Sequence, residues 1–278
     1  MGRINIFHPD DTERLRAYIG DELFMRQKAN QRACMFIKNQ ACFLAFTYYA
    51  PADIKGRGER ISLFCSREEL AVFCSAAAPL AAATSLSADK PPFTALLDFF
   101  HDLTAGDMDT LDQMEGQIQA FEDGLIMTRK PLGAAYTHII ALRRSVHKIK
   151  HCYEQMAFII DFCVENESGA IPKDLLPRFS ALSRRLHFLV DTALHLSECV
   201  NQAREAYQSK VDMEQNQIMK ILTIVTAVFS PLSLLVGWYG MNLQMPEYKW
   251  PWGYLYVILL SGAVCGLCIY IIKRRKWF

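Results

Sequence analysis

Ile221–Met241, ILTIVTAVFSPLSLLVGWYGM, is an uncharged stretch that is long enough to cross a bilayer as a helix. A second uncharged run, Trp252 to Ile272, follows after a short loop. It ends in the basic sequence Lys273-Arg274-Arg275-Lys276-Trp277-Phe278. The two runs predict a transmembrane hairpin, with a first helix at 218–242, an outer loop at 243–251 and a second helix with its basic tail at 252–278.

The charge balance of the chain is close to neutral. A formal net charge of +1 argues against a nucleic-acid binder. The basic residues that follow the second run place its end in the cytoplasm by the positive-inside rule, and two spans return the N-terminal part to the same side. No secretory signal peptide opens the sequence. We therefore expect a multi-pass protein of the plasma (inner) membrane, with both termini cytoplasmic and the lipid bilayer as a partner.

Residues 1–92 have the mixed pattern of a small cytoplasmic α/β domain. Strands are predicted from runs rich in Phe, Ile and Tyr at Ile4–Phe7, Ala33–Lys38, Cys42–Tyr49 and Ile61–Cys65. Helices are predicted at Asp21–Lys28 and Arg67–Cys74. The stretch Ala76–Pro92, rich in Ala, Ser and Pro, is interpreted as partly a linker or turn.

Residues 93–217 have the pattern of a cytoplasmic helical bundle and stalk. Apolar residues recur at intervals of three and four, which predicts helices packed along heptad seams, with breaks at Arg129–Gly133 and Asn166–Pro172. The last helix is predicted from Asp174 to Asn242, because membrane helices tolerate a proline such as Pro231. The fold class is therefore an α+β membrane protein, in which a small α/β domain and a long-helix stalk continue into a two-helix transmembrane hairpin. So long a helix needs neighbours, and identical copies supply them most simply.

One face of this long helix is polar or small along its whole length. Helix-to-helix contact explains a single pair of such residues, whereas an aligned stripe inside a bilayer favours the lining of a pore. The predicted pore-lining residues are Asn216, Met219, Leu222, Thr223, Thr226, Ser230, Ser233 and Gly237. Among them, Met219 and Leu222 are large and apolar, and such side chains at a narrow point close a pore by excluding water.

Acidic residues continue the same face into the cytoplasmic part. They are Asp191, Glu198, Glu205 and Asp212, at intervals of seven. Two interpretations stay open: a solvated helix face, or a lining that attracts cations and becomes a set of acidic rings when copies surround a pore. Glu247, in the outer loop, is also placed to attract a cation electrostatically.

The mouth of the hairpin carries neutral oxygen ligands. Asn242 offers a side-chain carbonyl oxygen and Gly240 a backbone one, while the span itself holds no charged ligand. Such oxygens suit a cation that keeps its water, and Mg²⁺ dehydrates most reluctantly among the common cations. We therefore expect Gly240, Met241 and Asn242 to select hydrated magnesium. No phosphate-binding loop is present, but the membrane potential supplies about 2.3 kcal/mol per charge per 100 mV.

Two other functions stay open. His147 and His151 share one helical face and suggest zinc or another divalent cation, although their basic neighbours favour a solvated surface. A membrane-tethered helical sensor or scaffold that binds partner proteins is the alternative of another class. An enzyme is not expected, because no nucleophile–base pair or metal-ligand cluster appears in order.

Several of these residues together resemble the CorA family of magnesium and divalent cation transporters. The resemblance rests on Thr226, Pro231, Gly237, the Gly-Met-Asn motif of Tyr239-Gly240-Met241-Asn242, and Met245-Pro246-Glu247 with the basic C-terminal end. It covers Lys220–Phe278 and, more loosely, Phe121–Met156.

The resemblance implies a homopentamer with a cytoplasmic funnel. It implies that Asn242 forms an outer selectivity ring and that Asn216, Met219 and Leu222 lie at a gate. It also implies that cytoplasmic magnesium binds between subunits and holds the pore shut, so that magnesium is both cargo and regulator. Candidate regulatory ligands are Asp89, Glu205 and Asp212.

Overall fold

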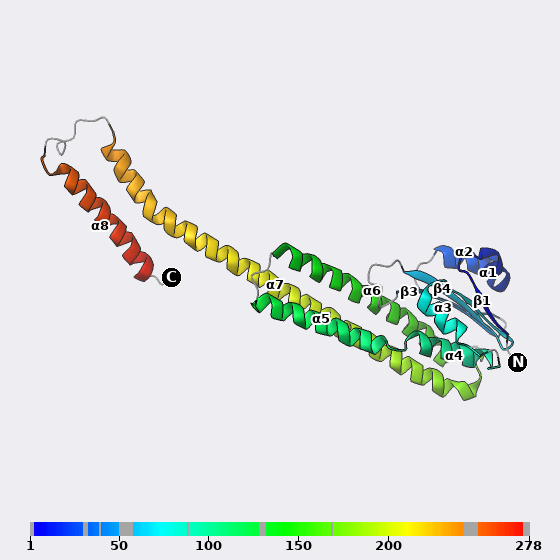
Figure 1. Cartoon of the computed structure of the whole chain (residues 1–278). Helices are drawn as coiled ribbons and strands as arrows, with labels where there is room; N and C mark the ends of the chain where they lie inside the picture. Colours follow the sequence, from blue (N-terminus) through cyan, green and yellow to red (C-terminus); the bar gives the residue numbers. More distant parts are fainter. Residues whose placement is uncertain are drawn as a thin grey trace. The chain divides into compact units, whose positions relative to one another are not determined.

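The computed structural model describes residues 3–29, 33–38, 40–49, 58–87, 89–127, 132–167, 169–241 and 250–274. The chain forms two compact units, Met1–Ala206 and Tyr207–Phe278. Helix α7, Leu176–Tyr239, begins in the first unit and ends in the second (Figure 1). We describe each unit by itself.

A five-stranded sheet organises the start of the first unit. Its strands are β1 (Arg3–Phe7), β2 (Cys34–Lys38), β3 (Ala41–Tyr48), β4 (Glu59–Cys65) and β5 (Glu69–Phe73). Their spatial order is β1-β5-β4-β3-β2, with β1 parallel to β5 and the other neighbours antiparallel. Because side chains alternate along a strand, β3 places Phe43 and Ala45 on one face and Leu44 and Phe46 on the other.

Helices cover both faces of this sheet (Figure 1). Helices α1 (Thr12–Ile19) and α2 (Asp21–Ala29) lie on the face of Phe43 and bury Leu15, Ile19 and Phe24 there. The opposite face packs on α3 (Ala77–Thr84), α4 (Pro92–Leu103) and α6 (Leu132–Glu165). The first unit is therefore a layered α/β fold whose larger core faces the helical bundle.

The bundle consists of α5 (Asp107–Met127), α6 and the first part of α7, which follows a short 3-10 turn at Lys173–Leu175. Each helix buries an apolar seam with three- and four-residue spacing, as the sequence predicts. The buried seam residues are Leu111, Met114 and Ile118 of α5, Ile139, Leu142, Val146 and Ile149 of α6, and Leu182, Leu186, Leu189 and Leu196 of α7.

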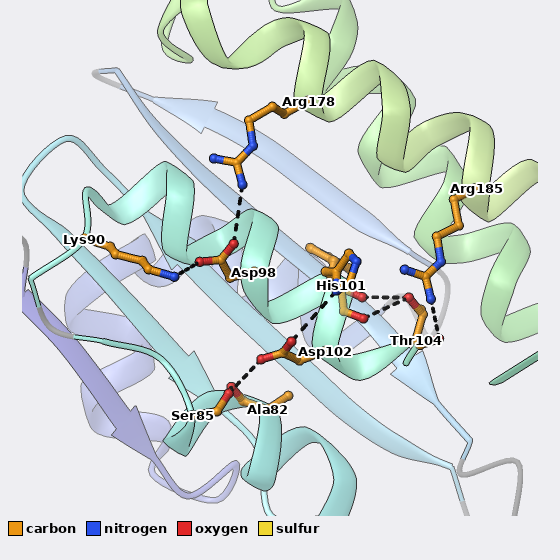
Figure 2. A network of polar contacts seen from close by, with 10 residues as sticks. Ala82, Ser85, Lys90, Asp98, His101, Asp102, Thr104, Arg178 and Arg185 are labelled. Atoms are coloured by element: carbon orange, nitrogen blue, oxygen red, sulfur yellow. Dashed lines mark hydrogen bonds and ion pairs between the residues drawn. The ribbon is translucent and has the colours of Figure 1, made fainter. Parts of the chain in front are cut away.

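Polar contacts fasten α4 to its surroundings, as Figure 2 shows. Asp98 pairs with Lys90 at 2.5 Å and with Arg178 of α7 at 3.6 Å. Arg185 of α7 donates from Nη2 to the Thr104 carbonyl at 2.9 Å, at the end of α4. The ion pairs are partly exposed and contribute little free energy, so they mainly orient α4 along α7.

The second unit holds the apolar helices. The later part of α7 contains Pro231 and ends at Tyr239, and α8 spans Gly253–Arg274. The expected long helix from Asp174 to Asn242 is confirmed as far as Tyr239, since the structure assigns α-helix from Leu176. Asn242 lies outside the described residues.

One local prediction is wrong, and two short helices were not predicted. The stretch Arg67–Cys74 is not a helix, because its residues Glu69–Phe73 form strand β5 and pair with β1 and β4, which overrides the helix-forming Arg-Glu-Glu start. The interpretation of Ala76–Pro92 as partly a linker or turn is confirmed at residues 85–87 and 89–91. The alanine-rich start of this stretch forms α3, which was not predicted and is anchored by Glu59, which accepts hydrogen bonds from the backbone N–H groups of Ser75 and Ala76. Helix α1 had no counterpart among the predicted elements. The four predicted strands and the helix at Asp21–Lys28 are confirmed.

We expect Leu186→Ala to destabilise the bundle, because this side chain is fully buried in the core. Its removal leaves a cavity and costs about 2–5 kcal/mol of unfolding free energy. Thermal unfolding of the full-length protein, followed by circular dichroism, measures the loss. Met25→Ala is the matched control, since Met25 is 62% exposed on α2 and should change the midpoint little. Equal midpoints for the two variants would contradict the packing described.

Candidate functional site

Two helical segments are long and apolar enough to span a membrane. They are Lys173–Tyr239, which contains α7 and has an apolar window of mean hydropathy 2.0, and α8, with 2.5. Neither window is buried inside the protein, so the apolar surface is not explained by a core of this chain. Helices can cross a bilayer because their backbone hydrogen bonds are made internally.

The predicted pore-lining residues lie on one continuous helix. Asn216, Met219, Thr223, Thr226, Ser230, Ser233 and Gly237 follow alternating steps of three and four residues on α7, and Leu222 adjoins them. All of these residues are exposed on the single chain, with Met219 at 58% and Leu222 at 57%. The structure thus groups them on one helix face, and their role as a lining stays a prediction.

Two hydroxyl groups on this face bond to their own helix. Thr223 Oγ1 donates to the Met219 carbonyl at 2.7 Å, and Thr226 Oγ1 donates to the Leu222 carbonyl at 2.8 Å. This bond satisfies the hydroxyl hydrogen in an apolar environment. The lone pairs of each hydroxyl oxygen stay available to accept a hydrogen bond, for example from a water molecule around a cation.

The end of α7 requires a glycine. Gly240 donates its backbone N–H to the Val236 carbonyl at 2.8 Å, and Met241 donates to the Trp238 carbonyl at 3.3 Å. A Cβ atom at Gly240 would lie 2.9 Å from the Val236 oxygen, closer than real contacts allow. The predicted selectivity residue Asn242 and the predicted cation-attracting Glu247 lie outside the described residues.

The predicted acidic residues on α7 are exposed. Asp191, Glu198 and Glu205 belong to the first unit and Asp212 to the second, where Asp212 Oδ1 accepts a hydrogen bond from Gln208 at 3.2 Å. Their exposure suits either a solvated face or a surface that attracts cations. That these acidic residues attract cations therefore stays a prediction.

Asp89, the other candidate regulatory ligand, lines a cavity of about 600 Å³ beside the sheet. The lining also contains Glu68 and Glu69, whose charges are offset by Arg3 and Arg67. Over the described residues, no group of three His, Cys, Asp or Glu side chains is arranged to hold a metal ion. Asp89 therefore stays a predicted ligand without assembled partners among the residues that the structure describes.

The histidine pair of the zinc alternative lies on α6. His147 and His151 are exposed, and His151 Nδ1 lies 3.7 Å from Glu154 Oε2. Lys150 also approaches Glu154, at 3.5 Å. This carboxylate is thus shared with a cation, which makes a weak ligand set for zinc.

One buried polar group was not predicted from the sequence. Asp107, the first residue of α5, is only 6% exposed. Burial raises its pKa to about 6, against lowering contributions from Tyr153 and Arg185. An acid at a helix N-terminus usually faces solvent, so its position gave no signal. The preceding Ala105-Gly106 turn was the available cue that the chain folds sharply there.

Comparisons with known proteins agree with this architecture. The model of the family described as CorA-like Mg²⁺ transporter protein matches residues 66–274. The cobalt/magnesium transport protein CorA of Thermotoga maritima is 26% identical over 168 residues, which cover 60% of this chain and about half, 47%, of that protein's length. The magnesium transport protein CorA of Salmonella typhimurium is 24% identical over 294 residues, covering 99% of this chain and 91% of that protein.

A solved structure shows the same fold. The complete CorA magnesium transporter of Methanocaldococcus jannaschii superposes with a TM-score of 0.78 at 16% identity, covering 99% of this chain and 90% of that one. The match of the family model extends from the end of β4 to the end of α8, and so includes the bundle and both apolar helices. The chain therefore belongs to the family of CorA-like Mg²⁺ transporter proteins.

Proposed function

We propose that this protein is a channel-like transporter that moves hydrated magnesium into the cytoplasm down its electrochemical gradient. The observation that carries the proposal is the polar face of α7, which continues through a segment otherwise apolar enough to span a membrane. Hydroxyl groups in a bilayer are costly unless they bond internally or meet water. Thr223 and Thr226 satisfy their hydrogens internally and keep oxygen acceptors for a hydrated ion.

Magnesium suits the neutral character of this path. Because Mg²⁺ keeps its inner water, oxygen acceptors contact its water hydrogens rather than the bare ion. We assign the selectivity segment to Gly240, Met241 and Asn242, with the cation attracted from outside by Glu247. A divalent ion moving inward gains about 4.6 kcal/mol per 100 mV, twice the value for a single charge. No further energy source is needed for inward flux.

The path requires several copies of the chain. One polar helix face cannot enclose water alone, so we propose a homopentamer in the plasma (inner) membrane, with both termini cytoplasmic. Asp191, Glu198, Glu205 and Asp212 would then recur as acidic rings that concentrate cations. The proposal divides the chain into a cytoplasmic α/β domain at 1–92, a cytoplasmic helical bundle and stalk at 93–217, and a membrane hairpin. In the hairpin the pore helix lies at 218–242, the outer loop at 243–251, and the second helix with its basic C-terminal tail at 252–278.

The gate is assigned to Asn216, Met219 and Leu222. The two apolar side chains are exposed at neighbouring positions of α7, where a ring of copies would form a hydrophobic constriction. We propose that cytoplasmic magnesium, bound between subunits through Asp89, Glu205 and Asp212, holds the gate closed. Carboxylates of different chains would complete a ligand set that the single chain lacks over its described residues.

Ion flux into liposomes tests this function directly. Magnesium influx driven by an inside-negative potential is expected, with inhibition by hexaamminecobalt(III), which resembles hydrated magnesium but cannot exchange its ligands. Zinc influx that exceeds magnesium influx would favour the zinc alternative. A protein that inserts and assembles but passes no divalent ion would instead fit a sensor or scaffold.

Asn242→Ala should abolish selective magnesium flux, because it removes the side-chain oxygen at the pore mouth. The oligomer should stay assembled, as native gel electrophoresis or light scattering will show. Asn216→Ala, at the other end of the stripe, separates loss of selection from loss of gating. Unchanged uptake and selectivity in Asn242→Ala would refute the selectivity assignment.

Met219→Gly should leave a more permeable pore, because it removes a large apolar side chain from the proposed constriction. Leak current in planar bilayers at millimolar cytoplasmic magnesium measures the effect. Met213→Gly is the matched control, since Met213 is similarly exposed, at 57%, but precedes the stripe. Equal closed-state conductance in the Met219 variant and the parent would rule out this gate.

Gly240→Ala should disturb the helix end and reduce magnesium flux severalfold, because the new methyl group would collide with the Val236 carbonyl. Gly116→Ala, in α5, is the control, since a Cβ atom there has nothing within 4 Å. Flux and oligomer size are measured for both. Wild-type flux in Gly240→Ala would show that the helix end tolerates the shift.

A further inference from the structure

The corner between α4 and α5 contains a buried acid. Helix α4 ends at Leu103, the chain turns through Gly106 with φ of 80°, and Asp107 begins α5. Thr104 is 1% exposed and Asp107 6%. Backbone bonds close the corner, from Asp107 N–H to the Thr104 carbonyl and from Thr110 N–H to the Gly106 carbonyl.

Three elements present titratable or charged groups to Asp107. The side chains concerned are Tyr48 of β3, Cys152 and Tyr153 of α6, and Arg185 of α7. Arg185 is the only cation among them, and its Nη2 donates to the Thr104 carbonyl at 2.9 Å (Figure 2). Asp107 Oδ2 and the Tyr153 hydroxyl oxygen are both buried. Neither atom makes a hydrogen bond of normal length and angle. The corner therefore encloses a carboxylate oxygen whose bonding capacity is unused.

Of Asp107 and the neighbouring tyrosine and cysteine side chains, only Asp107 titrates near neutral pH. Burial raises its pKa to about 6, while the nearby Tyr153 hydroxyl and Arg185 guanidinium oppose the shift. Burial raises the pKa of Tyr48 and of Tyr153 far above the neutral range, and that of Cys152 to about 12. Protonation of the corner near pH 6 is therefore a change at one carboxyl group.

We propose that Asp107 is a proton-operated latch that closes the α4–α5 corner against α6 and α7 when neutral and lets the corner open when ionised. A neutral carboxyl is cheaper to bury than a carboxylate, because Asp107 Oδ2 is buried in the corner without a hydrogen-bond donor. The ionised form has an unbonded oxygen that gains hydration when the corner opens. The latch acts on α7, which carries Arg185 and continues to Tyr239.

The direction of the pH dependence follows from the two protonation states. The closed corner binds its proton with a pKa of about 6, whereas an open, solvated carboxyl has the ordinary value of 3.8. The closed state is therefore favoured fully below the open-state pKa, and this advantage is lost as pH rises towards 6. The opening constant should rise by up to tenfold per pH unit across this interval, roughly a hundredfold in total, and level off above it.

Hydrogen exchange on the full-length protein in nanodiscs tests the latch without any reference to transport. The amides of Asp107 and Thr110 are followed from pH 4.5 to 7.5, after correction for intrinsic exchange rates. In the wild type, their opening constant should rise roughly 25-fold over this range and level off above pH 6, the part of the full rise that lies above pH 4.5. In Asp107→Asn it should be independent of pH, while the control Asp109→Asn, an exposed acid two residues away, should match the wild type.

A second variant covers the case in which Asp107→Asn fails to fold. Tyr153→Phe keeps the carboxyl but removes a hydroxyl that lowers its pKa, so the plateau should move to higher pH. Amides at the end of α3, such as that of Ser85, should show no comparable pH dependence if opening is confined to the corner. A flat wild-type profile, a slope that persists in Asp107→Asn, or an unmoved plateau in Tyr153→Phe would each overturn the proposal.

Discussion

The rest of the structure depends on one long helix that meets two solvents. In the first unit α7 buries Leu182, Leu186, Leu189 and Leu196 against its neighbours, so that packing holds it. In the second unit its surface is apolar and unburied, and its internal backbone bonds are what make an apolar environment tolerable. Because a single element serves both environments, α7 joins the packed bundle to the apolar segment through one continuous helical backbone.

Much of this fold was readable from periodicity. The bundle helices and α7 follow apolar repeats over many turns, and such long repeats leave little ambiguity. The helix predicted at Arg67–Cys74 was wrong because the prediction relied on local propensity. Residues Glu69–Phe73 form a strand between β1 and β4, and the parallel partner β1 is distant in sequence. Local helix propensity therefore opposed a non-local pairing, and the pairing prevailed.

The candidate site was likewise predictable from the sequence only in part. The stripe from Asn216 to Gly237 was visible because residues three and four apart share a helix face. The buried state of Asp107 was not visible, because it arises where β3, α6 and α7 converge on a corner. The assignments at Asn242 and Glu247 still rest on the sequence and its family resemblance, since both lie outside the described residues.

Pro231 has a mechanical consequence for α7. Proline has no backbone N–H, so the Ala227 carbonyl, one turn earlier, loses the donor that an ordinary helix would provide. Because of the missing hydrogen bond and the crowded proline ring, α7 bends at the turn before Pro231 with the lowest energetic cost. The stretches on either side of the proline can therefore tilt by different amounts, which gives the span a joint without breaking its helical continuity.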